Sequence, residues 1–244
     1  MIENSRQPDT YTLIDLDRTA LDTNKLYNLF TGMLSEQFDR TITTGLDYSC
    51  LTSEAKGLSF DVYTYLVSQL GEDAVGQFND YFIEQVARED MLNDGAADLM
   101  ADLALGGYPF GFLTTGGEKW QELKLKASQL DHVPHNIISQ SRKGEIIATW
   151  QNNGKFEVPA ELHANGGSVV YDRVVLVDDK PISFDGLPDG AEGLLYVKGG
   201  RSSKLPNAYY DLPGSIQVIA DLRQVRGYVK ADDSLMLDDR AVTV

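Results

Sequence analysis

The chain has 244 residues, of which 42% are hydrophobic and 24% charged, a composition typical of a soluble globular protein with one large domain or a core and an insert. Its 21 basic and 37 acidic residues give a formal charge of −16, which disfavours nucleic acid and anionic membrane surfaces as partners. The single cysteine, the polar N-terminus and the lack of any run of about 18 apolar residues predict a cytoplasmic protein without a membrane span.

The first predicted strand, from Tyr11 to Ile14, is followed at once by Asp15 and, two positions later, Asp17. Residues i and i+2 of a strand point to the same face, and a turn just past the strand would crowd them at its carboxyl end. Two like charges so close together are costly unless a cation binds them or one of them takes up a proton. For this segment alone, a strand that ends in a solvated turn is the alternative.

Residues 22–91 are predicted to form a helical block of about 70 residues with three helical stripes. Asp22 and Thr23 are suited to cap the first helix, and nothing in the block indicates a buried strand. Apolar residues recur there at spacings of three and four, as in Leu26, Leu29, Phe30, Met33 and Leu34.

From residue 92 onwards, helical patterns alternate with short apolar strands. Strands are predicted at residues 110–115, 136–139, 174–177, 194–197 and 216–219, with helices after Gly95, after Gly117 and from Gly144 to Trp150. This alternation predicts an α/β protein with a Rossmann-like parallel sheet. Ligands of such sheets bind outside the carboxyl ends of the strands.

Three of these strands end in residues capable of chemistry: Asp15 and Asp17, Thr114 and Thr115, and Asp178 and Asp179. In a parallel sheet the three ends share one edge, so four carboxylates and two hydroxyls are expected to converge there. Carboxylate oxygens with few imidazole or thiolate neighbours favour a hard cation such as Mg²⁺. Thr114 and the glycines after Thr115, at a helix start, would offer a hydroxyl and backbone N–H groups to a phosphate.

Taken together, these segments resemble the four motifs of the haloacid dehalogenase (HAD) superfamily: Asp15-Leu16-Asp17-Arg18-Thr19, the strand ending in Thr114, a downstream lysine, and Val177-Asp178-Asp179. Most members are Mg²⁺-dependent phosphatases, and many carry a helical cap between the first and second motifs. The resemblance implies a HAD-like core of residues 1–21 and 92–244. It also implies a cap of residues 22–91, whose candidates for selecting the leaving group are Tyr27, Arg40, Tyr48, Lys56 and Tyr63.

The resemblance also implies a role for each motif residue. Asp15 would be the nucleophile that forms an aspartyl-phosphate, and Asp17 the general acid and then the general base. Thr114 would hold the phosphoryl oxygens, with Arg18, Thr115 and Gly116 as further substrate-binding residues. Mg²⁺ would be held by Asp15, Asp17 (through its carbonyl), Asp178 and, in support, Asp179.

The lysine of the third motif is expected to be Lys143, which precedes Gly144 at a predicted helix start; Lys155 is the alternative. Lys124 and Lys126, on the helix after Thr114, are expected to be solvated. Arg18 departs from the family pattern, which has glycine directly after the second aspartate, and Ala20 stands where members have leucine. Arg18 either touches substrate or points to solvent.

The sequence therefore predicts a Mg²⁺-dependent phosphatase acting on a small phosphorylated metabolite. A phosphomutase, or a metal- and phosphate-binding sensor without turnover, are the alternatives; a dehalogenase is disfavoured because Asp17 would have no task. The glycine-rich segment 199–204 follows a predicted strand and is a further candidate for the active-site edge, and the last residues are expected to form an acidic tail.

Overall fold

The computed structural model describes residues 9–55, 60–199 and 215–229. Lys56, nearly all of the glycine-rich segment 199–204 and the acidic tail lie outside the described residues, so the expectations placed on them stay predictions. Within the described ranges, no helix combines the length and the apolar character needed to cross a membrane.

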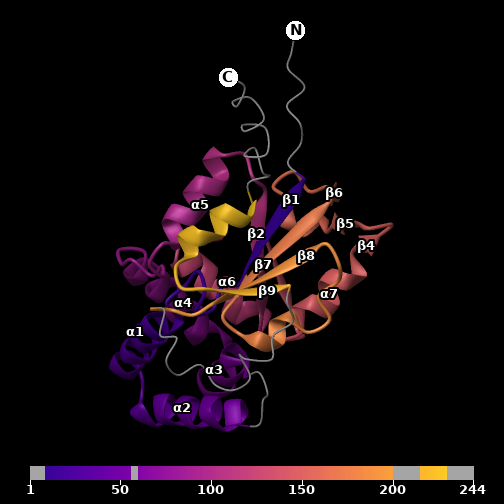
Figure 1. Ribbon diagram of the computed structural model, residues 1–244. Helices are drawn as coiled ribbons and strands as arrows, with labels where there is room; N and C mark the ends of the chain where they lie inside the picture. The colour runs from indigo at the N-terminus through magenta and orange to yellow at the C-terminus, as the bar shows by residue number, and fades with distance from the viewer. Residues whose placement is uncertain (1–8, 56–59, 200–214, 230–244) are drawn as a thin grey trace, which may run out of the picture.

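The centre of the molecule is a six-stranded parallel sheet with the order β3-β2-β1-β7-β8-β9 (Figure 1). This confirms the predicted α/β, Rossmann-like fold. The strands are β1 (Thr10–Ile14), β2 (Phe110–Thr115), β3 (His135–Ile138), β7 (Arg173–Asp178), β8 (Ala191–Tyr196) and β9 (Ile216–Ile219).

Both faces of the sheet are buried because the central strands are apolar at successive positions. Leu13 and Leu176 point into one hydrophobic cluster, whereas Ile14 and Val177 point into the other. The first cluster is completed by α7 (Lys143–Thr149) and the second by α5 (Ala96–Leu105) and α6 (Glu118–Ala127). Helices on both faces leave the strand ends as the free edge of the sheet.

The predicted helical block contains four helices: α1 (Thr23–Gln37), α2 (Arg40–Ala55), α3 (Val62–Leu70) and α4 (Glu72–Val86). The Asp22 carboxylate accepts a hydrogen bond from the Lys25 N–H and caps α1. Phe30 of α1 makes edge-to-face contacts with Phe82 of α4 and Trp120 of α6, so the block and one sheet face share a hydrophobic cluster. In Figure 1, α1, α2 and α3 lie together at one end of the sheet. The assignment of residues 22–91 to a separate cap domain stays a prediction.

The chain enters and leaves the helical block at one place. Leu21 and Leu92 form an antiparallel β-bridge. On either side of it, the Asp22 N–H donates to the Met91 carbonyl at 2.8 Å and the Asn93 N–H donates to the Ala20 carbonyl at 2.9 Å. The two connecting segments therefore run side by side, a few residues beyond Asp17.

A small antiparallel sheet of β4 (Gln151–Asn152), β5 (Lys155–Val158) and β6 (Val169–Tyr171) was not predicted. Phe156 and Val158 of β5 point into the hydrophobic cluster beside α7, while Lys155 and Glu157 face outward. Short 3-10 helices, η1 (Ala160–Leu162), η2 (Pro181–Phe184) and η5 (Leu222–Val225), and helix α8 (Arg226–Val229) complete the described fold.

Candidate active site

The register of the sheet places Asp15 beside Asp178. Ile14 of β1 lies opposite Val177 of β7, and the Asp15 N–H donates to the Val177 carbonyl at 2.8 Å. Asp15 follows β1 directly, and Asp178 is the last residue of β7. Both carboxyl groups are buried at the same edge of the sheet, as the sequence predicted for the ends of parallel strands.

Lys143 lies between these two aspartates. Its Nζ donates to Asp15 Oδ1 and, at 2.6 Å, to Asp178 Oδ2, and its side chain is only 2% exposed. Lys143 is the first residue of α7, and Gly144 lets this helix start approach η2 closely, since a Cβ at Gly144 would lie 2.5 Å from the Asp185 carbonyl. The alternative, Lys155, pairs with Asp172 on the surface.

Asp179 adds a third carboxylate to the cluster. Its Oδ2 accepts from Arg18 Nε at 3.0 Å, while its Oδ1 is buried and has no hydrogen-bond partner in the part of the chain that the structure describes. Arg18 adopts a left-handed backbone conformation, with φ of 62°, so the turn keeps the geometry that suits glycine. The structure therefore gives Arg18 a contact that the sequence did not suggest, an ion pair with Asp179.

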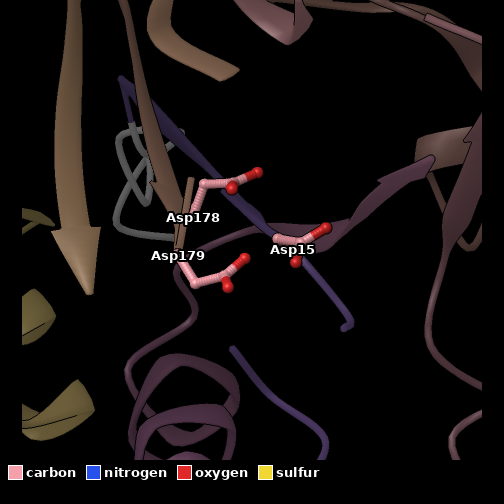
Figure 2. Close-up of side chains that lie close together, drawn as sticks. All are labelled: Asp15, Asp178 and Asp179. Carbon is pink, nitrogen blue, oxygen red and sulfur yellow. The ribbon is translucent and has the colours of Figure 1, made fainter. Parts of the chain in front are cut away.

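Asp15, Asp178 and Asp179 together fit a hard divalent cation. One carboxylate oxygen of each lies within 4.8 Å of the others (Figure 2). Lys143 and Arg18 make the ion pairs to these three carboxylates, so the cluster holds more carboxylates than ion-paired cations. The Asp179 oxygen that has no partner among the described residues and the all-oxygen donor set suit a hard divalent cation.

Burial raises the pKa of Asp15 to about 7, and the neighbouring Asp178 and Asp17 carboxylates add to the rise while Lys143 opposes it. Burial likewise raises the pKa of Asp179, against the effect of Arg18. A carboxylate acts as a nucleophile only when it is ionised, and a bound divalent cation favours that form. The electrostatics of this cluster therefore also suit a cation.

The end of β2 brings Thr114 to the same edge. The Thr114 side chain is fully buried, and its hydroxyl oxygen has no hydrogen-bond partner among the described residues. Buried hydroxyls are nearly always bonded, so Thr114 is suited to a ligand oxygen. Thr115 and Gly116 line the adjacent cavity, but the Thr115 hydroxyl donates to the Gln140 carbonyl and the Gly116 N–H donates to the Ile138 carbonyl.

Asp17 does not join the carboxylate cluster, because its side chain turns toward α6. Lys124 Nζ lies 2.5 Å from both Asp17 carboxylate oxygens, and Gln121 Nε2 and Thr23 Oγ1 each donate to Asp17 at 2.9 Å. The sequence prediction that Lys124 is solvated is therefore wrong, since its side chain is 2% exposed; Lys126 is exposed as predicted. Neither Lys124 nor Gln121 was predicted as a site residue.

These contacts keep Asp17 ionised. Burial alone would raise the pKa of Asp17, but the Lys124 ammonium and the hydrogen bonds from Lys124, Gln121 and Thr23 outweigh it and lower the pKa to about 2. Burial lowers the pKa of Lys124, whereas the neighbouring Asp17 carboxylate acts to raise it. In this arrangement Asp17 is a hydrogen-bond acceptor, the form that takes a proton from water.

A cavity of about 330 Å³ opens beside Asp17. Its charged end is formed by Asp17, Arg18, Lys124 and Lys180, and its other wall is formed by side chains of the helical block and α6, namely Tyr27, Cys50, Phe60, Val62 and Trp120. Of the candidates in the helical block, Tyr27 lines this cavity, whereas the Arg40 and Tyr48 side chains are exposed and Tyr63 packs against the hydrophobic cluster. A space of this size suits a small ligand.

Solved structures with the same arrangement of elements identify the fold. A haloacid dehalogenase-like protein of Burkholderia xenovorans LB400 is 15% identical, with a TM-score of 0.60 over 92% of this chain and 99% of that one. The HAD-type protein YfnB of Bacillus subtilis, solved with magnesium, is 13% identical, with a TM-score of 0.52 over 91% of this chain and 99% of that one. The chain has the HAD-like fold. The sequence itself matches no protein-family model, and no curated protein matches it.

The HAD-like fold alone does not distinguish the chemistries built on it. A dehalogenase solved with a reaction intermediate is also similar, 15% identical with a TM-score of 0.50 over 92% of this chain and 99% of that one. The activity must therefore be argued from the side chains of the site.

Proposed function

We propose that this protein is a Mg²⁺-dependent phosphatase that hydrolyses a small phosphomonoester through a phosphoryl group on Asp15. The observation that carries the proposal is the buried cluster in which Lys143 contacts Asp15 and Asp178, with Thr114 at the neighbouring strand end. Such a cluster offers a nucleophile, fixed positive charge and an unbonded hydroxyl within one site. Asp17, on the far side of the turn, supplies the acid and base that phosphoester hydrolysis needs.

In the first half of the proposed reaction, an Asp15 oxygen attacks phosphorus and forms a P–O bond. The ester P–O bond breaks, and the leaving oxygen takes a proton from Asp17, which must then be in its protonated form. Lys143 and the Thr114 hydroxyl lie where they would bind the phosphoryl oxygens and offset their charge. The products of this half are an alcohol and an aspartyl-phosphate at Asp15.

In the second half, water attacks the phosphorus of the aspartyl-phosphate. Asp17, now a carboxylate, takes a proton from that water, and the P–O bond to Asp15 breaks. Inorganic phosphate leaves, and Asp15 returns as a carboxylate. The ionised, hydrogen-bonded state of Asp17 in this structure is the form that this step uses.

Asp15, Asp178 and Asp179 would hold the cation, together with the Asp17 carbonyl that the resemblance implies. When bound, Mg²⁺ would neutralise charge on the phosphoryl group and favour the ionised form of Asp15. The magnesium in the YfnB structure supports this choice of ion.

The substrate would occupy the cavity of about 330 Å³ between the strand ends and the helical block. Residues 22–91 would then act as a cap that excludes water and selects the leaving group. Dehalogenation needs no acid or base at Asp17. The contacts that Lys124, Gln121 and Thr23 make to Asp17 stabilise its carboxylate form, which the second half of phosphoester hydrolysis uses as a base, and this supports the phosphatase.

The proposal is tested by hydrolysis of p-nitrophenyl phosphate with and without Mg²⁺, in the wild type, Asp15→Asn and the exposed control Asp131→Asn. We expect Asp15→Asn to lose at least about a thousandfold in kcat, the control to keep wild-type rates, and chelation to abolish turnover. Turnover that ignores both the metal and Asp15→Asn refutes the proposal. Mg²⁺ binding without hydrolysis of any phosphoester would favour a sensor. Transfer of the phosphoryl group between two positions of a sugar phosphate would favour a phosphomutase.

A further inference from the structure

The Asp17 side chain is held by more donors than any other carboxylate in the described site. Lys124 Nζ contacts both of its oxygens at 2.5 Å, Gln121 Nε2 donates to Oδ2 and Thr23 Oγ1 donates to Oδ1, both at 2.9 Å. With all these contacts in place, the carboxylate has little freedom to rotate. Two of the donors come from one helix, α6, in which they are a single turn apart.

Burial of the Lys124 ammonium carries a desolvation cost. Its ammonium lies at the face of Trp120, 5.7 Å from the ring centroid, and among the described residues its hydrogen bonds go only to Asp17. A buried ion pair of this kind is seldom more stabilising than apolar residues of the same volume. Its effect is instead geometric, because it fixes where the Asp17 carboxylate lies.

Gln121 connects Asp17 to the strand that carries Thr114. The same Nε2 that donates to Asp17 also donates to the Thr115 carbonyl at 2.8 Å. Gly116 leaves room for this amide, since a Cβ there would lie 2.6 Å from Gln121 Nε2. The position of Asp17 is thus set relative to the end of β2, where the phosphoryl group would bind.

We propose that Lys124 and Gln121 are positioning residues that hold Asp17 for the two proton transfers of the reaction. This inference rests on the proposed phosphatase function. Without the Lys124 ammonium, the Asp17 carboxylate would no longer be fixed at the edge of the cavity where the leaving oxygen and the attacking water would lie, while Asp15 and Lys143 would remain in place. Protonation of the leaving group and breakdown of the aspartyl-phosphate would slow, whereas attack on an ester with a good leaving group would change little.

The test compares Lys124→Met with Lys126→Met, a matched change on the exposed side of the same helix. Each variant is assayed on p-nitrophenyl phosphate, whose leaving group needs little protonation, and on an alkyl phosphate, whose leaving group needs it fully. For Lys124→Met we expect kcat/KM, which reports on the steps up to phosphoryl transfer, to fall about 100-fold on the alkyl ester, within the usual range of acid–base catalysis, and to change little on the aryl ester. Rapid-quench labelling should show phosphorylated protein accumulating with the aryl ester. Lys126→Met should behave as wild type.

A double-mutant cycle with Asp17→Asn separates positioning from direct contact with substrate. If Lys124 acts through Asp17, then adding Lys124→Met to Asp17→Asn should cause no further loss in either rate. An additive loss, or an equal loss of kcat/KM on the two esters, overturns the inference while leaving the proposed function standing.

Two further comparisons keep the inference testable. Should Lys124→Met fail to fold, Gln121→Met removes another hydrogen-bond donor to Asp17. We expect this variant to lose more kcat/KM on the alkyl ester than on the aryl ester. If it does not, the inference is overturned. A wild type that hydrolyses neither ester overturns the proposed function, and this inference with it.

Discussion

Replacing Lys143 with methionine tests the electrostatics of the buried cluster. Methionine keeps most of the apolar stem of lysine but removes the ammonium that contacts Asp15 and Asp178, whose side chains are 7% and 1% exposed. Removing one partner of a buried ion pair typically costs 3–5 kcal/mol, because the remaining charge is left unpaired. Here two carboxylates are left together, so we expect a loss of about 4 kcal/mol in the free energy of unfolding at pH 8 without Mg²⁺. That is a large part of the roughly 5–15 kcal/mol of a typical domain.

The sign of the pH dependence follows from Asp15. Its pKa in the folded protein is raised from 3.8 to about 7 by burial, so the folded state binds more protons near neutral pH than the unfolded state does. Stability therefore falls as the pH rises through about 7, and Lys143→Met should strengthen this trend because it removes the group that opposes the rise. The variant should thus regain stability between pH 8 and pH 6. Saturating Mg²⁺ should also restore it, by about 2.7 kcal/mol at a hundred times the Kd.

Urea denaturation followed by circular dichroism, at pH 8 and pH 6 and with and without Mg²⁺, measures these differences. Lys155→Met is the matched control, because Lys155 makes a single ion pair with Asp172 and both side chains are more than half exposed. Such surface pairs contribute about 0–1 kcal/mol. If Lys143→Met and Lys155→Met unfold at the same urea concentration, Lys143 is not a buried counter-ion of the cluster and the reasoning fails.

Two further predictions concern the backbone around the site. Gly144→Ala places a Cβ 2.5 Å from the Asp185 carbonyl, so it should lower the free energy of unfolding by about 1–3 kcal/mol and lower kcat by displacing Lys143. The control Gly76→Ala has open space on α4 and should stabilise the protein slightly. Equal urea midpoints for the two variants would contradict this prediction. Arg18→Gly and Arg18→Ala both remove the ion pair with Asp179, but only glycine tolerates φ of 62° without strain. Calorimetry should therefore find the glycine variant more stable than the alanine variant by about 1 kcal/mol. Equal stability of the two variants would show that this turn is unstrained.

The sequence predicted the parallel sheet and three of its acidic or hydroxyl-bearing ends because local signals agreed there. Val174 to Val177 is apolar and β-branched at nearly every position, which indicates a strand buried on both faces, and Asp178 follows directly. Parallel pairing places these ends at one edge of the sheet, and the strand order, in which β1 lies beside β7, brings Asp15 next to Asp178. The structure places Lys143 rather than Lys155 beside these aspartates, and its position at a helix start next to glycine was the sequence signal that favoured it.

What the sequence missed depends on which way a side chain turns. Two aspartates at i and i+2 were expected on one face, but β1 ends at Ile14, so Asp17 lies in a turn and faces α6 instead of the cluster. Lys124 was taken as solvated because it is charged. Its spacing from Trp120 and Ala127 placed it on the buried stripe of the helix, and this signal would have identified it. The β4–β5 hairpin was likewise signalled by Asn153-Gly154.

The paired connections at Leu21 and Leu92 make the helical block a replaceable module. Because the chain departs and returns at adjacent points, joined by hydrogen bonds between Asp22 and Met91 and between Asn93 and Ala20, the block can be exchanged without cutting a strand of the sheet. A chimaera that receives the corresponding segment of another HAD-like protein would keep Asp15, the proposed nucleophile, and would change the side chains that line the cavity. Plain excision would instead expose the aromatic contact of Phe30 with Trp120 to water, so grafting is the more promising route to redesign.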